Sequence, residues 1–430
     1  MSLTGTVVAL HAASDSDERF REALRGEVER LHPCSDPADL NDILRDSTII
    51  LAVVADCSGM SDEDLVSRIE AAERAIGDRN IPLVCLASRS FADVAAIRAD
   101  AILTHPVPPA AVIRQIGSLN RAKAREAEVA VRLVALREAG IAVAPPVMQI
   151  PGDQAGDETC DQISDRPSIL VVGTRGRFSQ IESILGAEVH TVAALTADMA
   201  NLYLGWQAFD AVVLDQAPFE AIDTLQLLRS NPVHHDLPII VLAEDFDKAM
   251  AERAYAAHAS DVVSLRASRA DLLVRLTCAI RTRRLDHQTQ EMLLRSQDAL
   301  TGADGTIPAS TFQRYLEHAS VTATRRNATL TVTRLVIEAD CGTLSAAQAL
   351  EVHRPLLRLI RRLVRIEDLT LIVQDSGLVT VFPDSSAEDT ERTLGRIRGI
   401  IRNTPISLDN GASPLRLDAS ARVTVFDPAA

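Results

Sequence analysis

The chain has 430 residues, and its 59 Asp and Glu against 44 Lys and Arg give a formal net charge of −15 at pH 7. This acidic balance argues against a protein whose general role is to bind nucleic acid or an anionic membrane, because such proteins carry a basic excess. Lys123 and Lys248 are the only lysines, so any chemistry that needs a lysine has two candidates.

Sequence patterns exclude several further classes. No apolar run approaches the roughly 20 residues that cross a membrane, and the N-terminus lacks the basic and apolar regions of a signal peptide. The six cysteines and ten histidines show no disulfide or metal-ligand spacing. We therefore expect a cytoplasmic protein with reduced thiols, no bound metal, no membrane insertion and no nucleic-acid partner.

The first 142 residues alternate between short apolar runs and segments with helical spacing of apolar side chains. This alternation predicts a parallel sheet with helices on both faces. The predicted strands are residues 5–10, 47–55, 81–86 and 101–104, and the predicted helices are residues 15–31, 62–76 and about 109–140.

Residues 143–166 contain Pro-Pro, Pro-Gly and clustered acids without apolar periodicity, which indicates a linker. The alternation then restarts over residues 167–290, which predicts a second domain of the same kind. The predicted strands are residues 168–172, 208–214, 237–242 and 261–264, and the predicted helices are residues 178–185, 218–229 and 268–294.

Residues 291–430 show a different order, with two strands joined as a hairpin around residues 374–377 and helices between the other strands. This order predicts an α+β domain. The predicted strands are residues 330–337, 369–373, 378–382 and 421–426, and the predicted helices are residues 310–319, 346–365 and 387–401.

Both α/β repeats resemble the receiver domains of response regulators, which are five-stranded flavodoxin-like units. That resemblance implies an acidic pair after the first strand to hold Mg²⁺, an acceptor Asp after the third strand, a hydroxyl after the fourth and a lysine after the fifth. In the first repeat the acidic pair reads His11-Ala12, the acceptor position falls within residues 52–54 near Asp56, and the lysine position is His105. The hydroxyl position there is Ala87, with Ser88 adjacent.

In the second repeat the acidic pair becomes Gly173-Thr174, the hydroxyl position is Ala243 and the lysine position is Leu265. Only the acceptor is kept, as Asp215. We interpret Asp215 as a vestigial phosphoacceptor, and both repeats as packing domains that form a homodimer, the role that receivers without this chemistry usually keep.

The third segment resembles the GGDEF domain of diguanylate cyclases, because Asp298-Ala-Leu-Thr-Gly302 matches the family's Asp-x-Leu-Thr-Gly motif. Receiver, receiver and GGDEF in this order is the architecture of PleD-type regulators. Cyclase activity in that family needs carboxylates that hold two Mg²⁺ ions. The family's Asp-x-Asp motif, in the strand before the long helix, reads Val336-Ile-Glu338 here, so its first, metal-binding Asp is lost. The signature Gly-Gly-Asp-Glu-Phe aligns with Gln374-Asp-Ser-Gly-Leu378. The expected acids are lost, so we expect no catalytic residues and no cyclase activity.

One ligand-binding motif of the family is kept. Arg365-Ile-Glu-Asp368 matches the Arg-x-x-Asp inhibitory site for cyclic di-GMP, at the family's spacing from the signature position. The resemblance implies ligand binding by Arg365 and Asp368, with a second arginine at Arg396 and support from Arg361 and Arg362. An Arg fork can grip a phosphate or a guanine edge, and a carboxylate can accept guanine N–H groups. Arg354, Arg358, Arg361 and Arg365 follow steps of four, three and four, so we expect them to form one helical stripe. The alternative is that this stripe is only the solvated face of an amphipathic helix.

These features resemble PopA-type cyclic di-GMP effectors, which implies an adaptor that recruits cell-cycle regulators to a protease at the cell pole. Cyclic di-GMP is then a regulatory ligand, and no cofactor is expected. Two alternatives stay open at this point. One is a response regulator with residual diguanylate cyclase activity, and the other is a ligand-free receiver-type scaffold.

Overall fold

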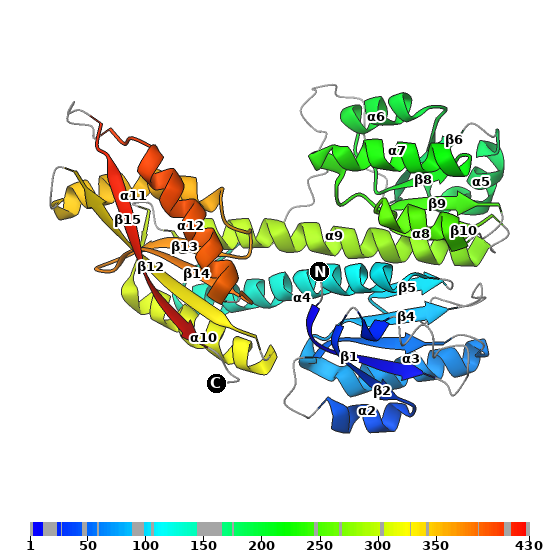
Figure 1. Ribbon diagram of the computed structural model, residues 1–430, viewed down its shortest axis with the longest axis horizontal. Coiled ribbons are helices and arrows are strands. Elements are labelled where there is room, and N and C mark those ends of the chain that lie inside the picture. The colour runs from blue at the N-terminus through cyan, green and yellow to red at the C-terminus, as the bar shows by residue number, and fades with distance from the viewer. Residues whose placement is uncertain are drawn as a thin grey trace. The chain divides into compact units, whose positions relative to one another are not determined.

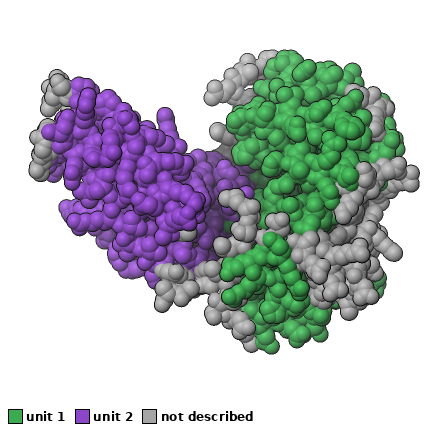
Figure 2. Space-filling model, viewed as in Figure 1, with its two compact units in different colours: residues 1–120, 147–285 green, residues 121–146, 286–430 purple. Residues whose placement is uncertain are grey.

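The computed structural model divides the chain into two compact units (Figure 2). Unit 1 contains Met1–Asn120 and Val147–Leu285, and unit 2 contains Arg121–Pro146 and Asp286–Ala430. The structure describes residues 3–11, 24–26, 28–44, 50–57, 60–87, 99–104, 107–143, 166–173, 176–244, 248–265, 269–301, 305–326, 328–340, 344–385, 387–407 and 414–426. Most of the predicted linker, together with Ala12, Ser88, His105, Thr174 and Gly302, lies outside these residues.

The first sheet is parallel, with strand order β2-β1-β3-β4-β5. This is the order of a flavodoxin-like doubly wound fold, which confirms the predicted fold class (Figure 1). The sheet comprises β1 (Leu3–His11), β2 (Val28–Cys34), β3 (Ile50–Asp56), β4 (Leu83–Ala87) and β5 (Ala101–Thr104), with helices α2 (Pro37–Ile43), α3 (Asp62–Ile76) and α4 (Pro109–Glu138).

The helix predicted over residues 15–31 is wrong at its C-terminal end. Val28–Cys34 forms β2, which pairs in parallel with β1 from Leu3↔Val28 to Leu10↔Cys34. The apolar spacing of Leu24, Val28 and Leu31 fits a helical stripe, but Val28 and Cys34 are instead buried as strand residues. The pairing of this segment with β1 makes it a strand, and such pairing cannot be recognised from a short stretch of sequence.

The second sheet repeats the first. Its order β10-β9-β8-β6-β7 is the same topology read from the other edge, and all its described pairs are parallel. Its strands are β6 (Ser168–Gly173), β7 (His190–Ala194), β8 (Ala211–Asp215), β9 (Ile239–Ala243) and β10 (Asp261–Ser264). Its helices are α5 (Phe178–Leu185), α6 (Ala197–Trp206), α7 (Pro218–Ser230), α8 (Lys248–Ala256) and α9 (Arg269–Leu300).

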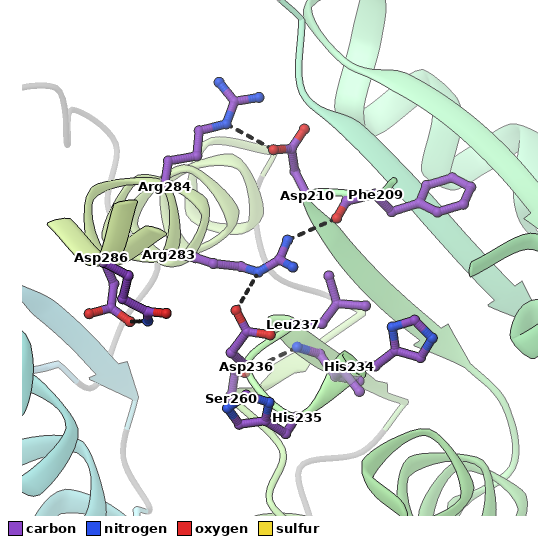
Figure 3. A network of polar contacts seen from close by, with 12 residues as sticks. Phe209, Asp210, His234, His235, Asp236, Leu237, Ser260, Arg283, Arg284 and Asp286 are labelled. Atoms are coloured by element: carbon purple, nitrogen blue, oxygen red, sulfur yellow. Dashed lines mark hydrogen bonds and ion pairs between the residues drawn. The ribbon is translucent and has the colours of Figure 1, made fainter. Parts of the chain in front are cut away.

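Charged contacts fix the first half of α9 to this second domain (Figure 3). Arg283 donates to the carbonyl of Phe209 at 2.9 Å and to Asp236 at 3.2 Å, and the next residue, Arg284, donates to Asp210 at 2.8 Å.

Within the described parts of the chain, none of the helices combines the length and the apolar character that a membrane crossing requires.

The third sheet is mixed, with strand order β11-β13-β14-β12-β15. β11 pairs in parallel with β13, and the other described pairs are antiparallel. The elements of this domain are β11 (Thr306–Ile307), α10 (Ala309–Arg326), β12 (Leu330–Ala339), α11 (Ala346–Arg361), β13 (Leu369–Val373), β14 (Gly377–Pro383), α12 (Ala387–Asn403) and β15 (Leu417–Phe426).

Each face of this sheet has its own core. Leu335, Ile372 and Leu378 face α11 and α12, while their neighbours along the strands face α10. The second core also takes side chains from the C-terminal parts of α4 and α9, such as Val131 and Leu300. The alternation of buried residues along β13 and β14 supplies both layers.

The predicted hairpin between β13 and β14 is confirmed. Val373 pairs with Gly377, and the turn places Asp375 and Gly377 at φ of 62° and 76°. The predicted helix over residues 346–365 instead ends at Arg361. Arg365 therefore lies outside the helix, and the expectation that it continues the helical stripe of Arg354, Arg358 and Arg361 is wrong.

Candidate ligand-binding site

The segment between α11 and β13 forms a short closed turn around Arg365 and Asp368. The N–H of Asp368 donates to the carbonyl of Arg365 at 3.1 Å, and the N–H of Arg365 donates to Oδ2 of Asp368 at 2.8 Å. The Asp side chain thus satisfies the backbone where the helix has already ended, a role that Asp often takes in turns. The turn holds Arg365 in place without using its side chain.

The guanidinium of Arg365 is available to a ligand. Arg365 is exposed, and no hydrogen bond or ion pair of its side chain joins it to another described residue. The same holds for Arg362, which lies at the C-terminal end of α11. An unpaired arginine fork on a fixed turn is suited to a planar anion or to a guanine edge.

Asp368 itself is only 3% exposed. One carboxyl oxygen, Oδ2, accepts the bond from Arg365, but the other, Oδ1, is buried and has no hydrogen-bond partner in the described part of the chain. Burial raises the pKa of this carboxyl to about 7, against a smaller opposing effect of the bond from the Arg365 backbone. A buried acceptor without a donor is costly, so Oδ1 is suited to accept an N–H from a bound molecule.

Glu367, in the middle of the motif, is buried and contacts helix α4. Arg125 of α4 donates to Glu367 at 3.3 Å and to both oxygens of Asp286 at 2.7 and 2.9 Å. Asp286 belongs to α9, so a single arginine ties the motif to both long helices within unit 2.

A second, fully buried arginine supports the same turn. Arg132 of α4 donates to the Glu367 carbonyl at 2.6 Å, to the Leu293 carbonyl at 3.0 Å and to Glu128 at 2.7 Å. The hydroxyl of Tyr315 donates to Glu128 at 2.8 Å. Burial raises the pKa of Glu128, and the adjacent Arg132 opposes that shift.

Sequence reasoning missed this network. Arg125, Glu128 and Arg132 lie in the helix predicted over about residues 109–140, and spacings of three and four residues place them on one face, but no role was predicted for them from the sequence. Arg132 and Glu128 pair locally, but the other partners of the two arginines lie 161 to 242 residues away in the chain, so no local pattern could have identified them.

The other predicted ligand residues lie differently. Arg361 donates to Thr301 at 2.8 Å, to Asp298 at 3.5 Å and to the Thr370 carbonyl at 3.3 Å. It therefore fastens the Asp-x-Leu-Thr-Gly motif to β13, and its donors are occupied. Arg396 is exposed on α12 and donates to Thr393 at 3.3 Å. Among the described residues, no hydrogen bond or ion pair joins Arg396 to the 365–368 turn.

Comparison with known proteins gives neighbours for single domains. No protein-family model and no curated protein matches the chain. Among solved structures, the receiver domain of a sensor histidine kinase from Pseudomonas aeruginosa is 21% identical, covering 27% of this chain and 98% of its own, with a TM-score of 0.25. A receiver domain of a signal transduction histidine kinase from Syntrophus aciditrophicus is 18% identical, covering 27% of this chain and 90% of its own, with a TM-score of 0.25.

A third solved structure similar to part of this chain contains a GGDEF domain. The coiled coil and GGDEF domain of DgcB from Caulobacter crescentus, in complex with c-di-GMP, is 16% identical and covers 36% of this chain and 83% of its own, with a TM-score of 0.27. At TM-scores of this size no function is assigned to this chain from these likenesses.

At the positions of cyclase chemistry, Asp375 is exposed in the hairpin turn and Glu338 pairs with Asp418 across β12 and β15. Asp418 accepts from Arg402 at 3.0 Å, and this contact lowers the pKa of Asp418. These two strands therefore place two carboxyls opposite each other, of which one is engaged by an arginine.

Asp215, the predicted vestigial acceptor, ends β8 and has a side chain only 2% exposed. Arg177 grips it with two nitrogens, the Nε–Oδ2 distance being 3.2 Å, and also donates to Glu244 at 2.6 Å. Gly173 faces it closely, since a Cβ at this position would lie 2.8 Å from the Asp215 carbonyl oxygen. Arg177 thus supplies the positive charge beside this carboxylate.

The first sheet places Asp56 where the second has Asp215. His11 pairs with Asp56 as Gly173 pairs with Asp215, at the end of the equivalent strand. The acceptor position of the first repeat is therefore Asp56, and its placement within residues 52–54 was wrong. Lack of a clear strand end in the apolar run over residues 47–55 explains the shift.

Proposed function

We propose that this chain is a cyclic di-GMP-binding effector that makes no cyclic di-GMP of its own. The observation that carries the proposal is the 365–368 turn, where, among the residues that the structure describes, the exposed Arg365 fork has no partner and the buried Oδ1 of Asp368 has no donor. Cyclic di-GMP offers the matching chemistry, namely phosphodiester oxygens for the arginine and guanine N–H groups for the carboxyl.

In this proposal Arg365 makes the first contact with the ligand. Asp368 holds the turn with Oδ2 and offers Oδ1 to guanine once the turn admits the base. Arg396 and Arg362 remain candidates for a second dinucleotide, since both are exposed arginines of the same domain. Arg361 supports the site indirectly, because its nitrogens are bonded to Thr301 and Thr370.

The absence of synthesis is part of the proposal. By the resemblance, the motif positions that hold Mg²⁺ in cyclases carry Val336, Ser376 and Gly377 here, and Asp375 lies in the turn. Incubation of the protein with GTP and Mg²⁺ should give no dinucleotide. Measurable product would replace our proposal with residual diguanylate cyclase activity.

The wider role is proposed on the resemblance alone. The ligand-bound protein would act in the cytoplasm as an adaptor at the cell pole, bringing cell-cycle regulators to a protease. The two flavodoxin-like domains would serve partner binding and homodimer formation. Capture of partners with and without cyclic di-GMP tests this role, and partners that bind equally in both states would contradict it.

Isothermal titration calorimetry of the full chain with cyclic di-GMP tests binding. We expect saturable heat for the wild type and at least a tenfold weaker affinity for Arg365→Ala, because a charge-assisted bidentate contact is worth about 1.5–3 kcal/mol. The matched control is Arg422→Ala, which removes an exposed arginine from β15 of the same sheet. Absence of heat from the wild type would favour a ligand-free scaffold.

A further inference from the structure

Helix α4 lies along the 365–368 turn within unit 2. Its residues 121, 125, 128 and 132 follow steps of four, three and four, so they share one face of the helix. Arg125 contacts the Glu367 side chain at 3.3 Å, and Arg132 contacts the Glu367 carbonyl at 2.6 Å. Arg121 is one helical turn from Arg125 on that face, at the open end of the row.

Arg121 shares its surroundings with Arg365 but has no carboxylate of its own. Both are exposed, and no hydrogen bond or ion pair joins either side chain to another described residue. Two carboxylates that act on its charge, Glu367 and Asp286, are already bonded to Arg125.

The electrostatics of Arg121 agree with this geometry. Desolvation lowers the pKa of the Arg121 guanidinium and the positive charges of Arg125 and Arg365 lower it further, while the carboxylates of Glu367 and Asp286 oppose the shift. Three guanidinium groups therefore gather beside two carboxylates. Such crowding of like charges is unfavourable unless an anion joins the group.

We propose that Arg121 is a further ligand-binding residue, which grips one phosphodiester of the cyclic dinucleotide held by Arg365. The inference rests on the proposed function and extends its site from the 365–368 turn to helix α4. Two guanidinium forks on two separate elements suit a ligand with two phosphodiesters on one ring. The bound dinucleotide would then fasten α4 to the turn between α11 and β13.

Calorimetric titration of the full chain with cyclic di-GMP tests the inference. Arg121→Ala should bind about tenfold more weakly than the wild type, and Arg121→Lys about threefold more weakly, because a lysine keeps the charge but loses the bidentate geometry. The control is Arg137→Ala, an exposed arginine of the same helix about 24 Å farther along its axis. Its affinity should equal that of the wild type.

The outcomes separate the two proposals. If Arg121→Ala binds as tightly as the wild type while Arg365→Ala does not, the role of Arg121 is overturned and the proposed function stands. If the wild type gives no saturable heat, both fall. An equal loss of affinity in Arg121→Ala and Arg137→Ala would indicate a general charge effect and overturn the specific contact. Thermal melting followed by circular dichroism verifies that each variant is folded at the temperature of the titration.

Discussion

The N–H of Arg365 donates a 2.8 Å hydrogen bond to Oδ2 of Asp368, whereas Oδ1 of the same carboxyl is buried without a partner among the described residues. One half of the Asp368 side chain is thus used to build the turn, and the other half is unsatisfied. Because Arg365 keeps an exposed guanidinium, the two residues of the motif have separate tasks. Asp368 shapes the site, and Arg365 presents the charge.

The free energy of unfolding should fall as pH rises from about 4 to 7. Burial raises the pKa of Asp368 from 3.8 to about 7, so in this range the folded chain holds a proton that the unfolded chain releases. This pKa difference can lower the free energy of unfolding by at most about 4 kcal/mol. Asp368→Asn cannot ionise, so in calorimetric melts its stability relative to the wild type should be higher at pH 8 than at pH 5.

The control for that experiment is Asp375→Asn, which removes an exposed carboxyl from the neighbouring hairpin. Its effect on melting temperature should differ little between the two pH values. A difference between Asp368→Asn and wild type that is the same at pH 5 and pH 8 would contradict the ionisation of this carboxyl near neutral pH.

Ligand affinity should also depend on pH. Guanine N–H groups donate to an ionised carboxyl, so binding would lower the pKa of Asp368 and release a proton. The affinity for cyclic di-GMP should therefore increase between pH 6 and pH 7.5. Below the pKa of about 7 that Asp368 has in the ligand-free protein, the increase should be at most about tenfold for each pH unit. Calorimetry in buffers of different ionisation enthalpy measures the released proton, and none released would refute direct acceptance by Asp368.

Arg132→Met should destabilise unit 2 by about 3–5 kcal/mol, because it leaves Glu128 buried without its cation. It also removes the donors to the carbonyls of Leu293 and Glu367. In the double variant with Glu128→Gln, part of this loss should return, since the buried charge is gone. Differential scanning calorimetry measures both, with Arg137→Met as the exposed control on the same helix, expected within about 0.5 kcal/mol of wild type. Equal losses in the single and double variants would argue against a charge penalty.

Local signals explain which elements were predictable. Helix α3 was predicted to the residue, over 62–76, because Ser61 caps its first turn and Gly77 at φ 53° ends it. Strand β13 was also predicted to the residue, since its five residues are all apolar or β-branched and all buried. In both cases the information lies within a few residues of the boundary.

The site was only partly predictable for the opposite reason. The motif fixes Arg365 and Asp368 in sequence, but their unequal exposure depends on contacts made by α4, which precedes them by more than 200 residues. Arg361 fits the arginine stripe in sequence, yet its side chain turns to Thr301 and Thr370. Helical spacing shows which residues share a face, but it does not show what that face meets.

Arg177→Ala should destabilise unit 1 by about 2–4 kcal/mol. The substitution leaves the carboxylate of Asp215, 2% exposed, without the arginine that now bonds both of its oxygens. Asp215→Asn in the same chain should restore part of the stability, because the unpaired charge is removed. Glu244→Gln is the control, since this side chain is 59% exposed and contacts Arg177 from the solvent side, and its effect should stay below about 1 kcal/mol. Urea unfolding followed by fluorescence of Trp206, the single tryptophan of the chain and part of α6, reports on this unit. Stability unchanged in Arg177→Ala would mean that the arginine does not neutralise Asp215, and that the carboxylate has kept the free charge which a phosphoacceptor needs.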